Sequence, residues 1–138
     1  MTRKALLGSI VPAVVAILAV NFGTQWYANN KALSPSEVNE VLVKAMSEFS
    51  KTLPVVIDEY TRVDSVAAGD LEITYFHTIT GFDENLLTTE LWSSIEARTR
   101  ESATRESEIE IFRRNGVDMH YIYLAEDGHE LFRFVLEH

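Results

Sequence analysis

The chain has 138 residues, 46% of them apolar and 24% charged, which is an ordinary composition for one globular domain. Its formal net charge is −9, and all 21 acidic residues lie from Glu37 onward. Because such a surface repels phosphate backbones, binding to nucleic acid is not expected. The absence of cysteine excludes disulfides, thiolate metal ligands and cysteine nucleophiles.

An uncharged apolar segment runs from Ala5 to Phe22, and a helix of that length spans about 27 Å, close to the hydrocarbon core of a bilayer. Arg3 and Lys4 precede the segment, and Trp26 follows it where interfacial aromatic residues are common. This pattern predicts a retained signal anchor. A cleaved secretory signal and a buried core helix are the alternatives.

The anchor divides the chain into two predicted parts. Residues 1–30 would form a cytoplasmic stub, the transmembrane anchor and its interface, and residues 31–138 an extracytoplasmic α+β domain. The predicted location is therefore a bacterial inner membrane, crossed once, with the C-terminal domain in the periplasm.

A helix is predicted to begin at Ser34, which can cap it, with Pro35 in the first turn and Glu37 completing a capping box. The helix would end before Pro54. Apolar residues at three- and four-residue spacing predict its buried stripe. These are Val38, Leu42, Ala45, Met46, Phe49 and Leu53.

Two strands, over residues 55–66 and 71–80, are predicted to form a hairpin around Gly69 and Asp70. Alternation in the second strand predicts one inward face. Its members are Leu71, Ile73, Tyr75, His77 and Ile79.

A second helix is predicted to start after Asp83, with Leu91 and Ile95 in its buried stripe. Residues 96–110 alternate in charge, which is typical of a solvated helix face. Asn115 and Gly116 predict the end of the helical region.

The chain ends in a second predicted hairpin, with strands over residues 117–124 and 130–136 and a turn at 126–129. The predicted fold is therefore α+β: a transmembrane helix, then an α-β-β-α-β-β domain. Its four-stranded antiparallel sheet would be packed by helices on one face.

Catalytic, cofactor and metal sites are not predicted, because the chain lacks the spacing motifs that would place ligands or nucleophiles together. An enzyme or a small-ligand binder would need His77 and His120 to meet in a pocket. The simpler interpretation places both as half-buried histidines of the sheet.

A partner surface is predicted instead. Arg62 and Asp64 are two residues apart on a strand and therefore face the same way, as an ion pair or a recognition spot. Phe76 adds aromatic surface, and Arg98 and Arg105 belong to the charged helix that could meet a partner.

Two stretches resemble a loosely defined group of uncharacterised bacterial envelope proteins. The first runs from Leu53-Pro54 through Thr61-Arg62-Val63-Asp64-Ser65 to Tyr75, and the second from Gly116 through Tyr121-Ile122-Tyr123 to Asp127-Gly128. The resemblance implies an envelope location and implies no activity.

The leading hypothesis is a non-enzymatic, membrane-anchored envelope protein whose α+β domain binds an unknown protein partner, as an accessory subunit of a larger assembly. The alternatives are an immunity or inhibitor-type protein that blocks a toxin or phage component, since acidic domains suit basic targets, and a small-ligand binder or enzyme.

Overall fold

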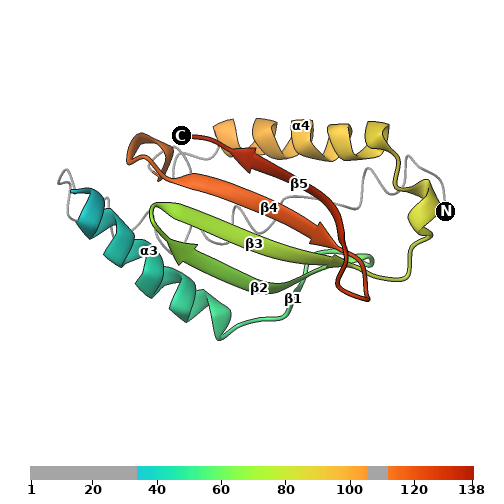
Figure 1. Cartoon of the computed structure of the whole chain (residues 1–138), viewed down its shortest axis with the longest axis horizontal. Coiled ribbons are helices and arrows are strands. Elements are labelled where there is room, and N and C mark those ends of the chain that lie inside the picture. Colours follow the sequence, from blue (N-terminus) through green and yellow to red (C-terminus); the bar gives the residue numbers. More distant parts are fainter. Residues whose placement is uncertain (1–33, 106–111) are drawn as a thin grey trace.

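The computed structural model describes residues 34–105 and 112–138, which form one five-stranded sheet with helices packed against it. Figure 1 shows helix α3 (Pro35–Ser50) beside β2 and helix α4 (Thr89–Arg105) beside β5, with the short 3₁₀ helix η1 (Glu84–Leu86) ahead of α4. The strands are β1 (Val55–Val56), β2 (Thr61–Gly69), β3 (Glu72–Ile79), β4 (Asp118–Leu124) and β5 (Glu130–Leu136).

Helix α3 begins as its sequence predicts. The Glu37 backbone N–H donates to Ser34 Oγ at 3.2 Å, and the Ser34 backbone N–H donates to Glu37 Oε1 at 3.2 Å. This reciprocal pair satisfies two backbone donors that the first helical turn would otherwise leave free. The predicted stripe from Val38 to Phe49 is buried against the sheet.

The predicted first strand, residues 55–66, is in fact two strands separated by a turn. Asp58 Oδ1 accepts hydrogen bonds from the backbone N–H groups of Tyr60 at 2.8 Å and Thr61 at 2.9 Å. A side-chain acceptor that binds the backbone two and three residues ahead stabilises a turn. The chain therefore reverses after β1, which pairs with only Arg62 and Val63 of β2.

The predicted four-stranded antiparallel sheet is wrong in both strand number and direction. The strand order is β1-β2-β3-β4-β5, and β3 pairs with β4 in parallel, while the other neighbours are antiparallel. The reason is that α4 carries the chain back along the sheet between β3 and β4, so that both strands run in the same direction. The prediction of two separate hairpins did not take this crossover into account.

One face of the sheet forms the core together with both helices. Ile73, Tyr75, His77 and Ile79 of β3 all point into it, as the alternation predicts. Aromatic rings stack through this layer: Tyr121 on Phe134 at 5.0 Å and 7°, His77 on Tyr123 at 4.4 Å and 13°, and Trp92 of α4 on Phe132 at 5.2 Å and 10°. The helices thus cover one face and leave the other without a helical layer among the described residues.

Helix α4 begins later than predicted, whereas the helical region does end at Asn115 and Gly116 as predicted. Asp83 caps η1, where its Oδ1 accepts from the Asn85 N–H at 2.9 Å, and α4 itself begins at Thr89. Thr99 and Ala103 are buried, so the stretch predicted to be solvated packs partly into the core. Arg100 donates to the backbone oxygen of Val135 at 2.8 Å, which fixes α4 along the edge of β5.

Within residues 34–105 and 112–138, none of the helices has the length and apolarity needed to cross a bilayer. This corrects the prediction of a single-pass inner-membrane protein. The segment from Ala5 to Phe22, on which that prediction was based, lies outside the described residues.

Leu42 and Val43 are adjacent in α3 but differ in burial, with Leu42 fully buried and Val43 47% exposed. We expect Leu42→Ala to lower the free energy of unfolding by about 2–5 kcal/mol, because it leaves a cavity in the core. Val43→Ala, the matched control, should change it by about 0.5 kcal/mol or less. Urea unfolding followed by circular dichroism measures both, and equal losses would contradict the described packing.

Burial lowers the pKa of His77 to about 4. As the pH falls below about 6.5, the histidine of the unfolded chain is protonated while the buried His77 of the folded chain stays neutral. The free energy of unfolding contributed by His77 is therefore complete above about pH 6.5 and decreases toward pH 4, by up to about 3 kcal/mol. We expect His77→Phe, which keeps the stacked shape, to weaken this acid dependence. The control His120→Gln should retain it, and identical pH profiles of the wild type and His77→Phe would refute the assignment.

Candidate functional site

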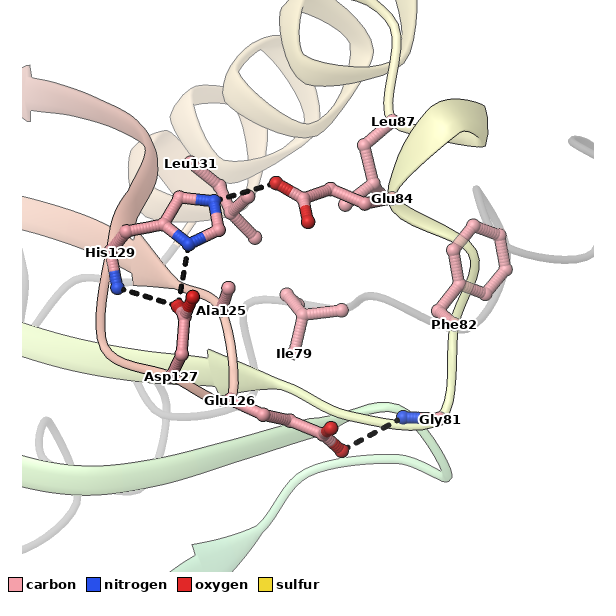
Figure 2. Close-up of a pocket in the computed structure, with 10 residues that line it drawn as sticks. All are labelled: Ile79, Gly81, Phe82, Glu84, Leu87, Ala125, Glu126, Asp127, His129 and Leu131. Atoms are coloured by element: carbon pink, nitrogen blue, oxygen red, sulfur yellow. Dashed lines mark hydrogen bonds and ion pairs between the residues drawn. The ribbon is translucent and has the colours of Figure 1, made fainter.

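A pocket lies at the carboxyl ends of the two parallel strands, where β3, η1 and the β4–β5 turn come together (Figure 2). Its volume is about 240 Å³. In open sheets that contain parallel strands, the carboxyl ends of those strands are the usual place for ligands, because the loops diverge there. The lining residues are Ile79, Gly81, Phe82, Glu84, Leu87, Ala125, Glu126, Asp127, His129 and Leu131.

The β4–β5 turn presents the polar side of the pocket. It closes through backbone hydrogen bonds from Gly128 N–H to the Ala125 oxygen and from Ala125 N–H to the His129 oxygen, both at 2.9 Å. Gly128 has φ +93°, a conformation that glycine adopts without strain. The predicted turn is therefore confirmed: it directs the side chain of Asp127 toward His129, and that of His129 toward Glu84 in η1 (Figure 2).

His129 joins this turn to η1 through two carboxylates. Its Nδ1 lies 2.5 Å from Asp127 Oδ1 and its Nε2 lies 2.6 Å from Glu84 Oε1 (Figure 2). The hydrogen bonds to Glu84 and then to Asp127 raise the pKa of His129 above its ordinary value. The His129 backbone and side chain in turn lower the pKa of Asp127.

This arrangement suits structure and recognition better than catalysis. An imidazole can donate from both nitrogens only when it is protonated, and here both nitrogens face carboxylate oxygens. A general base must accept a proton, so His129 held in this way is poorly placed for that role. It acts as a clasp between a turn and a helix that are 45 residues apart.

The inner wall of the pocket is apolar. Phe82, Leu87 and Leu131 supply it, with Ile79 at the end of β3 (Figure 2). Phe82 is fixed by an edge-on contact with Tyr60, with ring centroids 5.0 Å apart at 75°. The pocket therefore combines an ordered hydrophobic wall with a rim of carboxylates.

Arg62 and Asp64, the predicted ion pair, do meet. Arg62 Nε pairs with Asp64 Oδ1, Arg62 Nη2 reaches Asp64 Oδ2 at 3.3 Å, and the Thr78 hydroxyl also donates to Asp64. Partial burial acts to raise the pKa of Asp64, but the hydrogen bonds from Arg62 and Thr78 lower it overall. The hydrogen bond to Asp64 and the charge of Asp64 raise the pKa of Arg62, and the negative charge of Glu126, a residue of the pocket rim, adds to this effect.

The other predicted surface residues are not brought into the same patch. Phe76 lies on β3 and is partly exposed, on the sheet face opposite the helices and shared with Arg62. Arg98 is partly exposed on α4, which packs on the core face, and Arg105 is the last residue of that helix. That these five residues contact a partner stays a prediction.

His77 and His120 do not converge. His77 points into the core, where it is 1% exposed and its Nδ1 lies 3.3 Å from the Ile122 oxygen. His120 pairs in register with Thr74, which alternates with His77, so its ring lies on the opposite face of the sheet, 3.5 Å from Glu72. The paired-histidine site that an enzyme would need is therefore not formed.

Glu84 and His129 were missed by the sequence interpretation. They are 45 positions apart, and neither stands in a motif with the other. The sequence contained only an indirect signal for this contact: Asp and His in the turn after one strand, and acidic residues at the start of the helix after another.

Among residues 34–105 and 112–138, no group of three potential ligands is arranged to hold a metal ion.

The chain belongs to a family of unknown function: the profile named Domain of unknown function (DUF8479) matches residues 37–132. That range runs from the first turn of α3 to the start of β5 and includes every residue that lines the pocket. No curated protein sequence matches the chain significantly.

Solved structures share the fold at low sequence identity. A Pseudomonas aeruginosa protein inferred to be secreted, PA3611, has a TM-score of 0.65 and 12% identity over 78% of this chain and 95% of its own. The type 2 secretion pilotin EpsS of Vibrio vulnificus gives 0.58 and 10%, covering 75% and 90%. The type II secretion pilotin AspS of Vibrio cholerae gives 0.59 and 12%, covering 75% and 91%.

We expect Glu84→Gln to lower the pKa of His129 toward its ordinary value, because the substitution removes the carboxylate whose hydrogen bond raises that pKa most. Since that pKa is raised in the folded state, the clasp stabilises the fold below the unfolded-state pKa and loses this effect as the pH rises through the folded-state pKa. NMR titration of the histidine ring protons measures the shift. Glu40→Gln, on the exposed side of α3, is the control, and an unchanged midpoint in Glu84→Gln would rule out the clasp.

Proposed function

We propose that this member of the DUF8479 family is a non-enzymatic accessory protein of a bacterial envelope or secretion assembly, and that it acts by binding a protein partner. The observation that carries the proposal is the fold. It is shared with two pilotins of type II secretion systems over three quarters of the chain, although fold alone does not dictate function.

Two features of the chain support a binding role. The pocket at the carboxyl ends of β3 and β4 is ordered by the His129 clasp, which gives a partner a fixed surface and little entropy to lose on docking. The stretches around Arg62 and Tyr121 resemble bacterial envelope proteins, which supports a location in the cell envelope.

The charge of the chain indicates the kind of partner. With a net charge of −9, the protein attracts basic surfaces and accelerates encounter with them. This fits a role as an accessory subunit that recognises one component of a larger assembly.

The test is affinity purification of the tagged full chain from its own host after crosslinking in the cell, with an unrelated tagged protein of similar negative charge as the control. We expect one component of a secretion or envelope assembly to be enriched over that control, and the reciprocal purification to return this chain. Purification as a monomer without an enriched partner would overturn the proposal. Enrichment of a toxin or a phage protein would favour an inhibitor instead.

A further inference from the structure

We propose that the pocket between η1 and the β4–β5 turn is the anchor point for one basic residue of the partner, an arginine or a lysine. This inference rests on the proposed function and adds the chemistry of recognition to it. It draws on the size of the pocket, its two kinds of lining and the state of its carboxylates (Figure 2).

The size of the pocket favours a single side chain. Pockets that enclose whole small-molecule ligands usually measure about 300–1,000 Å³, whereas this one measures about 240 Å³. It is also partly open to solvent, so a residue projecting from another protein can enter it. A small pocket at an open end of a sheet is the geometry of an anchor site in a protein interface.

The lining matches the two halves of a basic side chain. Arginine and lysine have apolar stems and charged ends, and here Phe82, Leu87 and Leu131 can contact the stem while carboxylates lie at the rim. An acidic side chain would be repelled by that rim, and a neutral polar side chain could donate a hydrogen bond to it but would leave its charge uncompensated. A purely apolar side chain would gain nothing from the charge of the rim.

Glu126 is the carboxylate best placed to receive the charged end. Glu84 and Asp127 are already engaged by His129 at 2.6 and 2.5 Å. Glu126 instead accepts a long hydrogen bond of 3.4 Å from the Gly81 N–H, and its charge acts on Arg62. A guanidinium or an ammonium group could therefore bind Glu126 without breaking the clasp.

The direct test uses short peptides as probes. The ¹⁵N-labelled full chain is titrated with acetyl-Gly-Arg-Gly-amide and, separately, with the same peptide carrying citrulline, which is close to arginine in shape but neutral. We expect saturable shifts of the Gly81, His129 and Leu131 amides with the arginine peptide, and affinity at least tenfold weaker for the citrulline peptide. Equal binding of the two peptides, or shifts away from these residues, would overturn the proposal.

Two variants assign the charge that is responsible. Glu126→Gln should weaken binding of the arginine peptide about tenfold. Glu130→Gln, an exposed carboxylate that pairs with Arg133 and lies outside the pocket, should bind it as the wild type does. Wild-type affinity in Glu126→Gln would refute the assignment, and matching amide spectra of the free variants establish that both are folded.

Failure here can be told apart from failure of the proposed function. If crosslinking returns a partner equally from the wild type and from Glu126→Gln, the protein binds a partner through another surface and only the anchor site is refuted. If the partner is lost from Glu126→Gln and retained by Glu130→Gln, the pocket is the anchor.

Discussion

The parallel pairing of β3 with β4 is the constraint on which the rest of the structure depends. Helix α4 returns the chain along the sheet, so Ile79 and Leu124 end their strands at the same side. The loops that follow, one leading to η1 and one to β5, must then leave the sheet next to each other. The pocket and the His129 clasp exist because of this arrangement, and an antiparallel pairing would have placed the two loops at opposite ends.

The same crossover divides the sheet into two chemically different faces. Because α3 and α4 both pack on one face, that face is filled with aromatic rings, and His77 lies among them as a neutral side chain. The opposite face carries Arg62, Asp64 and Thr78 in one hydrogen-bonded group. Burial therefore keeps His77 neutral and away from any ligand, whereas the charged groups that remain accessible lie on the opposite face and at the exposed end of the sheet.

The sequence patterns correctly predicted those features that depend on residues close together in the chain. These features are the capping box at Ser34, the alternation of β3 and the turn at residues 126–129, and each is present.

The patterns failed for features that depend on contacts between residues far apart in the chain. Helix α4 reverses the expected direction of β4, and Glu84 meets His129 across 45 positions. Periodicity contains no information on such pairings.

Electrostatics then connects the predicted surface with the pocket that the sequence did not reveal. Arg62 belongs to the predicted ion pair, yet its pKa also responds to Glu126 at the pocket rim. The clasp uses the positive charge of His129 to hold Glu84 and Asp127, so these two rim carboxylates share one compensating charge within the protein. Glu126 accepts a hydrogen bond of 3.4 Å from the Gly81 N–H, and its charge makes a minor contribution to the raised pKa of Arg62. Of the three rim carboxylates, Glu126 is thus the one that a cation from outside can bind without displacing His129.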